Sequence, residues 1–227
     1  MTSRLRGLGI VLGLIGLAFI VAGGFAFFKV QEGTASLRAF SAAQGVELAY
    51  NDQGKLVDGG ETAGADAIMA MLTDDWGYPV VASELDPADP VVNTASEYMF
   101  QMATVAYHTL HGVQTIVLEE DVEYNGQLFT AGTYEFPVDG RYWADFDRAH
   151  PLEGPARGQA WTGVAHALIG ELGVGTVTAQ ALQLGLALAG LFAGLGGTLV
   201  LTGAGLVWAT QPEKVRAPAL RPAIEGI

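Results

Sequence analysis

The sequence of 227 residues contains no cysteine. Disulfides, thiol chemistry and iron–sulfur clusters held by cysteine are therefore excluded. A domain outside the cytoplasm would have to be stabilised by its own apolar core. Such a core is feasible, because a domain of about 150 residues buries roughly two-thirds of the surface of its unfolded chain.

Basic residues are scarce as well. Lysine and arginine number 11 against 24 aspartates and glutamates, and the formal net charge is −13. The imbalance is concentrated in residues 30–178, where 22 acidic residues stand against five basic ones. Nucleic-acid binding depends on cations that neutralise phosphates, so no nucleic-acid partner is expected. The same acidity disfavours a domain that lies flat on anionic lipid.

Common catalytic motifs are absent from the sequence. It has no GxSxG nucleophile elbow, no HExxH zinc motif, no phosphate-binding P-loop and no dinucleotide-binding glycine pattern. We therefore expect a non-enzymatic protein without a cofactor.

Long uncharged stretches are what the sequence does have. The first runs from Gly7 to Phe28 and covers about 33 Å as a helix, enough for a hydrocarbon core of about 30 Å. Basic residues flank it: Arg4, Arg6 and Lys29. A cleaved signal peptide is the alternative, but its apolar region would be only about 7–15 residues long and would end in a small-x-small site. We predict a retained transmembrane helix over residues 7–29.

The second uncharged stretch lies between Glu171 and Glu213. From Ala181 to Trp208 nearly every residue is apolar, a length greater than that of a core helix in a globular domain. Trp208 stands where an interfacial aromatic anchor is expected. We predict a transmembrane helix over residues 179–209, with a helix from about residue 159 leading into it.

Charge at the two ends predicts the orientation. Basic residues precede the first span and follow the second: Arg4, Arg6, Lys214, Arg216 and Arg221. By the positive-inside rule, residues 1–6 and the proline-rich tail 210–227 are cytoplasmic. Residues 30–178 then form an acidic extracytoplasmic domain. The prediction is a multi-pass protein of the plasma membrane.

Glycine is frequent in both spans. Gly9 with Gly13, and Gly190 with Gly194, form small-xxx-small pairs that let helix backbones approach closely. We expect them to pack helices within the hairpin or between copies. The partners implied are the lipid bilayer and either a homo-oligomer or a larger membrane complex. Neither apolar stretch, 7–28 or 181–208, carries an ionisable residue, so no ion or proton path is indicated.

The domain between the spans has a mixed pattern that predicts an α+β fold. A helix from Asn93 or Thr94 to His111 is the clearest element, because either residue can cap it and Thr94 and Glu97 have the spacing of a capping box. Asn125-Gly126 is a strong hairpin signal. Further helices are expected at 33–44 and 62–72. A turn at 51–54 is expected to join short extended segments at 46–50 and 56–57. A small antiparallel β-meander is expected over residues 113–118, 122–124, 127–129 and 133–138.

Three groups of residues are candidates for binding. His108 and His111 share one helix face and are weak metal-ligand candidates, with the alternative that they bond local carbonyls or face solvent. Asp121 to Gly126 resembles the start of an EF-hand loop, but Gly132 stands where the closing glutamate should be, which favours a charged turn. A candidate interface is rich in aromatic residues and arginine, with the alternative that its rings close the core: Tyr142, Trp143, Phe146 and Arg148.

The basic N-terminus, first span, acidic middle and Ala/Gly/Leu-rich second span resemble a group of actinobacterial two-span membrane proteins. Such proteins are often labelled as small subunits of aromatic-ring-opening dioxygenases. That chemistry needs an iron site with histidine and carboxylate ligands, and the residues here do not support the label. The expected function is a structural or accessory subunit of a cell-envelope assembly. An extracytoplasmic binding or sensor module for a small ligand or cation is the alternative, followed by a metal-dependent enzyme.

Overall fold

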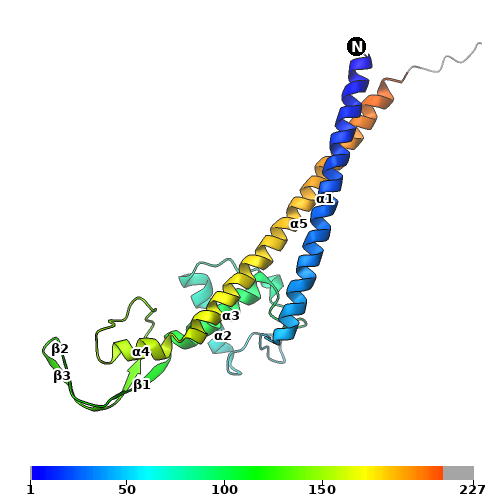
Figure 1. Ribbon diagram of the computed structural model, residues 1–227. Helices are drawn as coiled ribbons and strands as arrows, with labels where there is room; N and C mark the ends of the chain where they lie inside the picture. The colour runs from blue at the N-terminus through cyan, green and yellow to red at the C-terminus, as the bar shows by residue number, and fades with distance from the viewer. Residues whose placement is uncertain (1, 212–227) are drawn as a thin grey trace, which may run out of the picture. The chain divides into compact units, whose positions relative to one another are not determined.

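The computed structural model describes residues 2–211, and the expected basic tail from residue 212 onward lies outside them. Two helices are much longer than the others, α1 (Thr2–Gln44) and α5 (Gly163–Ala209). The chain divides into two compact units, one formed by described residues up to Val30 with those from Gly185, and the other by Gln31–Leu184. Both long helices contribute to both units (Figure 1).

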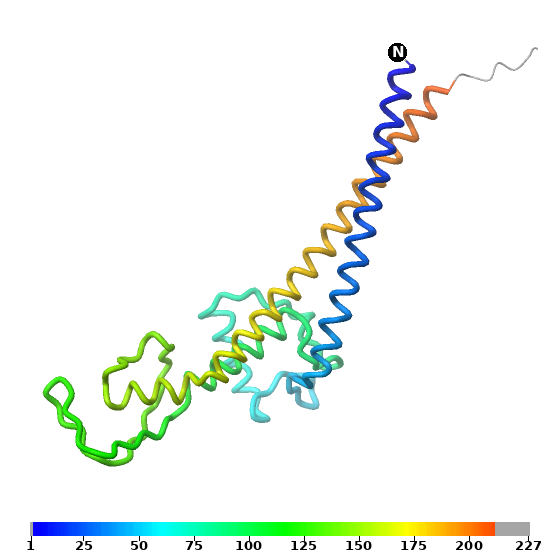
Figure 2. Tube along the Cα trace, in the orientation of Figure 1, coloured from blue at the N-terminus to red at the C-terminus, as the bar shows by residue number. Residues whose placement is uncertain are grey.

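In the first unit α1 and α5 form an antiparallel pair (Figure 2). Each helix is long and apolar enough to cross a membrane. Only 11% of the most apolar window of each helix is buried. The two helices therefore leave most of their apolar surface uncovered within the described chain.

Small residues at intervals of seven line the contact between the two helices. Cβ atoms added to Gly9 and Gly16 would each lie 2.6 Å from a backbone oxygen of α5, that of Gly203 and of Gly196 respectively. At Gly23 an added Cβ would lie 2.8 Å from the oxygen of Ala189. Seven residues bring a helix back to within about 20° of the same direction, so the three positions share one face. We call this contact the glycine seam.

The glycine seam differs from the predicted pairs. Gly9 lies in it, and the backbone of Gly13 is opposite Gly203, although an added Cβ on Gly13 itself would meet nothing within 4 Å. Gly190 and Gly194 also have no neighbour within 4 Å of an added Cβ, so the prediction that they pack the hairpin is wrong. Four residues advance a helix by about 40° beyond one turn, which turns Gly13 away from the contact line on which Gly9 lies. Packing between copies stays a prediction.

The second unit is built around α3 (Ala95–Leu110). The Thr94 hydroxyl accepts from the Glu97 N–H, and the Glu97 carboxylate accepts from the Thr94 N–H, which confirms the predicted capping box. Buried core residues include Ile68, Leu72, Val92, Phe100, Ala103, Leu110, Ile116, Val138, Phe146 and Trp161. Shorter helical elements pack around them: α2 (Thr62–Ala70), a π-helical turn η1 (Met71–Asp75), a 3-10 turn η2 (Ala82–Glu84) and α4 (Glu153–Ala160).

The strands form one long hairpin (Figure 1). Strand β1 (Val113–Leu118) pairs with β4 (Gly132–Pro137), and β2 (Val122–Tyr124) pairs with β3 (Gln127–Phe129). The four strands and the Asn125-Gly126 turn were predicted, and both turn residues have positive φ, 50° and 80°, as a type I′ turn requires. The predicted meander, in which each strand pairs with the next one along the chain, is wrong, because β1 pairs with β4. The Asp121 carboxylate accepts from the Ala131 N–H and carries the pairing across the gap between the two ladders.

Three other segments differ from expectation in extent. The predicted helix 33–44 is the end of α1, because no helix breaker separates it from the first apolar stretch. The segments at 46–50 and 56–57 meet through a single bridge, Tyr50 with Leu56, around the predicted turn. The helix leading into the second apolar stretch begins at Gly163 as the start of α5.

The capping carboxylate of Glu97 predicts a pH effect. Glu97 is 1% exposed, and this burial raises the pKa of its carboxyl above the ordinary 4.5. The backbone N–H groups of Asn93 and Thr94 donate to the carboxylate and lower the pKa, but burial has the larger effect. Burial first, and the charge of Glu97 second, also raise the pKa of the Tyr50 hydroxyl to about 12. A buried carboxyl with a raised pKa stabilises the fold fully below its unfolded pKa, and this contribution is lost as pH rises through the folded pKa.

We expect Glu97→Gln to retain the cap, because the amide oxygen still accepts from both N–H groups, and to remove this pH dependence. Thermal unfolding of the full chain between pH 4.5 and 7.5 checks the prediction. The wild type should lose melting temperature relative to E97Q as the pH rises. Parallel curves would contradict it. Glu97→Ala, which leaves two N–H groups without their acceptor, should cost about 1–3 kcal/mol relative to E97Q across this pH range.

Candidate functional site

A cavity of about 400 Å³ lies inside the second unit. Its walls come from the last turns of α1, the first turns of α5, the segment after α1 and the start of α3. Most lining side chains are apolar: Leu37, Phe40, Val46, Val92, Leu168, Leu172 and Val174. Ligand pockets in proteins have volumes of about 300–1,000 Å³ and are mostly apolar with a few placed polar groups. The cavity therefore has the dimensions and composition of a small-molecule site.

Tyr98 on α3 forms one wall of this cavity. Its hydroxyl and the hydroxyl of Ser41 on α1 are 2.7 Å apart and buried together. Its ring lies against Gly175 on α5, where an added Cβ would be 2.5 Å from the ring. A larger residue at position 175 would displace the ring, so the glycine permits the approach. Tyr98 thus contacts both long helices and holds them at a fixed distance on this side.

The polar groups of the cavity are few. Gln44 on α1 donates to Glu171 on α5 over 3.1 Å. The Thr178 hydroxyl donates a hydrogen bond to the Val174 carbonyl, one turn earlier in α5. Among the described residues that line the cavity none is basic. The cavity can enclose an apolar body and offer a carboxylate acceptor at its polar side.

Sequence reasoning missed these residues. Ser41 and Glu171 are polar residues within otherwise apolar helical stretches, and Gly175 interrupts a helix rich in larger residues. Each of these signals is weak alone, because the cavity joins segments that are more than 100 residues apart in the chain.

The predicted metal candidates make separate contacts. His108 Nε2 lies 3.0 Å from a carboxylate oxygen of Asp58. His111 donates from Nδ1 to the Tyr107 carbonyl over 2.8 Å, and its ring lies 4.1 Å from the Tyr107 ring. The alternative that one histidine bonds a local carbonyl therefore holds for His111. Within residues 2–211 no group of three or more histidine, aspartate or glutamate side chains is placed to hold a metal.

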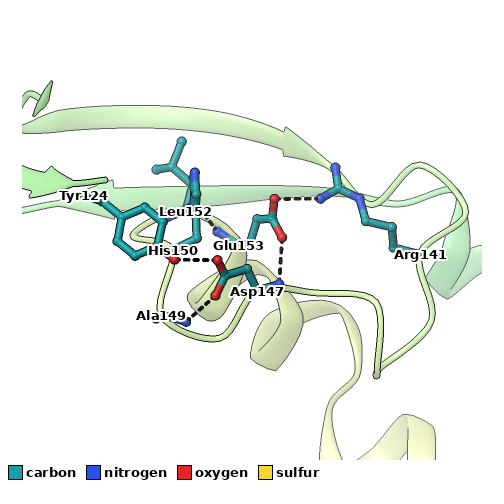
Figure 3. Close-up of polar contacts among 7 residues, drawn as sticks. All are labelled: Tyr124, Arg141, Asp147, Ala149, His150, Leu152 and Glu153. Carbon is teal, nitrogen blue, oxygen red and sulfur yellow. Dashed lines mark hydrogen bonds and ion pairs between the residues drawn. The ribbon is translucent and has the colours of Figure 1, made fainter. Parts of the chain in front are cut away.

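The loop after β4 is fastened by a polar network (Figure 3). The Asp147 carboxylate accepts from the Tyr124 hydroxyl at the hairpin and from the Ala149 N–H, and the tyrosine bond holds the pKa of Asp147 below its ordinary value. Glu153 accepts from the Asp147 N–H and pairs with Arg141 at 3.2 Å. These contacts join the hairpin, the loop and α4.

The network also orients a histidine. His150 Nδ1 accepts from the N–H groups of Leu152 and Glu153 at the start of α4, which fixes Nε2 as the protonated nitrogen (Figure 3). Its ring packs edge to face with those of Tyr124 and Phe129, with ring centres 5.3 and 5.0 Å apart. The histidine is thus used as a helix cap and packing group.

The candidate interface residues separate into two groups. Phe146 is buried in the core, where the Arg141 guanidinium lies 5.5 Å from its ring, so it belongs to the core alternative. Tyr142 and Trp143 are 41% and 38% exposed, and Arg148 is exposed. Of the four residues of the candidate interface, Tyr142, Trp143 and Arg148 therefore lie on the surface.

Aromatic and cationic groups stack around the exposed tryptophan. The Arg157 guanidinium lies 3.1 Å from the centre of the Trp143 ring, and its Nε donates to the Trp143 carbonyl. The rings of His166 and Trp143 pack edge to face, with their centres 5.0 Å apart. Partial desolvation lowers the pKa of Arg157. We call Tyr142, Trp143, Arg157 and His166 the aromatic face.

In comparisons with known proteins, no family model, curated protein or solved structure matches this chain.

Proposed function

We propose that the chain is a two-span protein of the plasma membrane, with both ends in the cytoplasm and residues 30–178 outside. The observation that supports this most is the 11% burial of the apolar windows in α1 and α5, since a helix in the core of a soluble protein would be mostly buried. Lipid is the environment that would cover this surface. The glycine seam supplies the close packing that replaces the hydrophobic effect between helices in a bilayer.

Retention of the first span is favoured by the residues that follow it in α1. Leu37 packs against the core of the second unit, and Ser41 bonds Tyr98. The helix that contains the apolar stretch is thus also a structural part of the outer domain, which a cleaved signal peptide is not.

Within that membrane location we propose a non-enzymatic, accessory role through assembly with a second copy or a larger membrane protein. The aromatic face supports it, because tryptophan, tyrosine and arginine dominate the energetics of protein interfaces. Trp143 is already ordered by Arg157 and His166, so little side-chain entropy is lost when a partner covers it. The spans carry no ionisable residue between Gly7 and Phe28 or Ala181 and Trp208.

Native mass spectrometry of the full chain, extracted in mild detergent, tests this role. We expect a homo-oligomer or a defined complex, and we expect Trp143→Ala to weaken it by about 2 kcal/mol or more, since it removes a central aromatic anchor. Leu128→Ala is the matched control, because Leu128 is 60% exposed on the hairpin and lies outside the aromatic face. A strictly monomeric wild-type protein would contradict the assembly role.

A second function, an extracytoplasmic binding module, is favoured by one different observation. The cavity between α1, α3 and α5 has the volume of a ligand site and convergent polar groups. The two functions are compatible, because the cavity and the aromatic face share no residue.

A further inference from the structure

We propose that the cavity binds a single-chain amphiphile taken from the membrane surface, with an apolar body and a polar end that donates hydrogen bonds and carries no negative charge. This inference rests on the binding-module function proposed above. It concerns the class of ligand, and four features of the cavity support it.

The first feature is the chemistry of the walls. Branched aliphatic side chains and one phenyl ring line most of the cavity: Leu37, Phe40, Val46, Val92, Leu168, Leu172 and Val174. These groups offer no hydrogen bonds, so a sugar or amino acid would lose its hydration without compensation. A hydrocarbon chain has no hydrogen bonds to water to lose, and each methylene that it buries contributes about 0.8 kcal/mol to binding.

The second feature is the set of free hydrogen-bonding positions. The hydroxyls of Ser41 and Tyr98 already bond each other inside the cavity. Glu171 receives one bond, from Gln44 to Oε1. A carboxylate has about four acceptor positions and no donor, and Glu171 is exposed, so a ligand that donates can replace water at the remaining positions.

The third feature is charge. Glu171 is the one charged side chain among the described residues of the lining, and the domain of residues 30–178 holds 22 acidic residues against five basic ones. A carboxylate, sulfate or phosphate on the ligand would meet a like charge at short range. An alcohol or an ammonium group would not, and an ammonium would pair with Glu171.

The fourth feature is supply. Along α1 the lining begins at Leu37, shortly after the predicted span ends at Lys29. Single-chain amphiphiles partition into bilayers and are concentrated at that surface. The membrane is therefore the nearest reservoir for a ligand of this class.

Photolabelling of the full chain in phosphatidylcholine vesicles tests the proposal. Three probes with one chain length and one diazirine, ending in a hydroxyl, an ammonium or a carboxylate group, are activated by light, and labelled peptides are mapped by mass spectrometry. We expect the alcohol and the amine to label residues 37–46 and 168–178. The carboxylate at pH 8 should label them about tenfold less, as one unfavourable charge contact of about 1.4 kcal/mol predicts.

Two matched valines on α5 supply the control. Val174 lines the cavity and Val177 does not, while the two are 67% and 65% exposed. Val174→Trp should abolish labelling of the cavity peptides, and Val177→Trp should leave it unchanged. Both substitutions are at exposed positions, and equal melting temperatures verify that both variants fold. Glu171→Gln should raise labelling by the carboxylate probe and leave labelling by the alcohol probe unchanged.

The outcomes distinguish a failure of the proposed ligand class from a failure of the binding-module function. Equal labelling of the cavity by all three probes, blocked by V174W, would leave the binding module intact and overturn the ligand class. Labelling confined to the apolar stretches 7–28 and 181–208, or equal labelling in V174W and V177W, would overturn both.

Discussion

Replacing Gly16 with leucine is expected to break the packing of α1 against α5 in the first unit. An added Cβ at this position would already lie 2.6 Å from the backbone oxygen of Gly196 and 2.8 Å from Val200, distances that real Cβ atoms do not adopt. Backbone atoms cannot move aside alone, so the helices must separate and lose the contacts of the neighbouring turns. The expected cost is about 3 kcal/mol, the upper part of the range for overpacked sites.

The same helix supplies the control for this prediction. Gly13→Leu introduces the same side chain one turn earlier, where an added Cβ meets nothing within 4 Å. On α5, Gly196→Leu and Gly197→Leu form the equivalent pair, because Gly196 faces Gly16 and Gly197 faces open space. The glycine seam therefore predicts opposite outcomes for two neighbouring residues, which a general preference for glycine in apolar helices does not.

Cross-linking measures this packing directly, since the chain has no cysteine of its own. The rings of Phe19 and Phe192 stack at 5.8 Å across the seam, so cysteines placed at these two positions report its closure. We expect the yield with a short bifunctional maleimide to fall about tenfold or more with G16L, the fall that about 1.4 kcal/mol or more predicts. The yield should be retained with G13L. Equal yields would show that the seam does not hold the helices together.

Tyr98→Ala is expected to be the most damaging substitution in the second unit. The ring is 8% exposed and packs on Gly175, and removing a large buried ring costs about 3–5 kcal/mol. It also leaves the buried Ser41 hydroxyl without the partner it has at 2.7 Å. The cavity would lose one wall together with the contact that spaces α1 and α5.

Tyr98→Phe separates the ring from its hydroxyl. It keeps the packing but leaves Ser41 unsatisfied, at a cost of about 1–3 kcal/mol. Adding Ser41→Ala removes the unpaired group and should recover part of that loss, so the double-mutant cycle should give a coupling energy of about 0.5 kcal/mol or more. Thermal unfolding followed by near-ultraviolet circular dichroism measures all four proteins. Additive losses in the two single variants would contradict the buried hydrogen bond.

Local signals in the sequence predicted the elements that depend on local chemistry. Thr94 and Glu97 form their capping box within one helical turn, and Asn125-Gly126 adopts the left-handed angles of its turn without help from distant residues. The two apolar helices followed from length and composition alone.

Features that depend on distant pairing were not predictable from one sequence. The meander was wrong because strand pairing beyond the first turn is set by contacts such as Asp121 with Ala131, not by local pattern. The glycine seam needs the register of α1 against α5 before its period of seven is distinguishable from other glycines. The cavity needs Ser41, Tyr98 and Gly175 together, and nothing in the sequence places these residues side by side.

The accessibility of single cysteines in intact cells tests the two-span membrane topology most directly, because the natural chain has no cysteine and contributes no background. Cysteine is placed singly at four exposed positions, Ser3, Asp52, Glu119 and Gln211. A membrane-impermeant maleimide should label positions 52 and 119 in intact cells, and positions 3 and 211 only after permeabilisation. Labelling of positions 3 and 211 in intact cells, or recovery of the protein in the soluble fraction, would contradict the two-span topology with both ends in the cytoplasm.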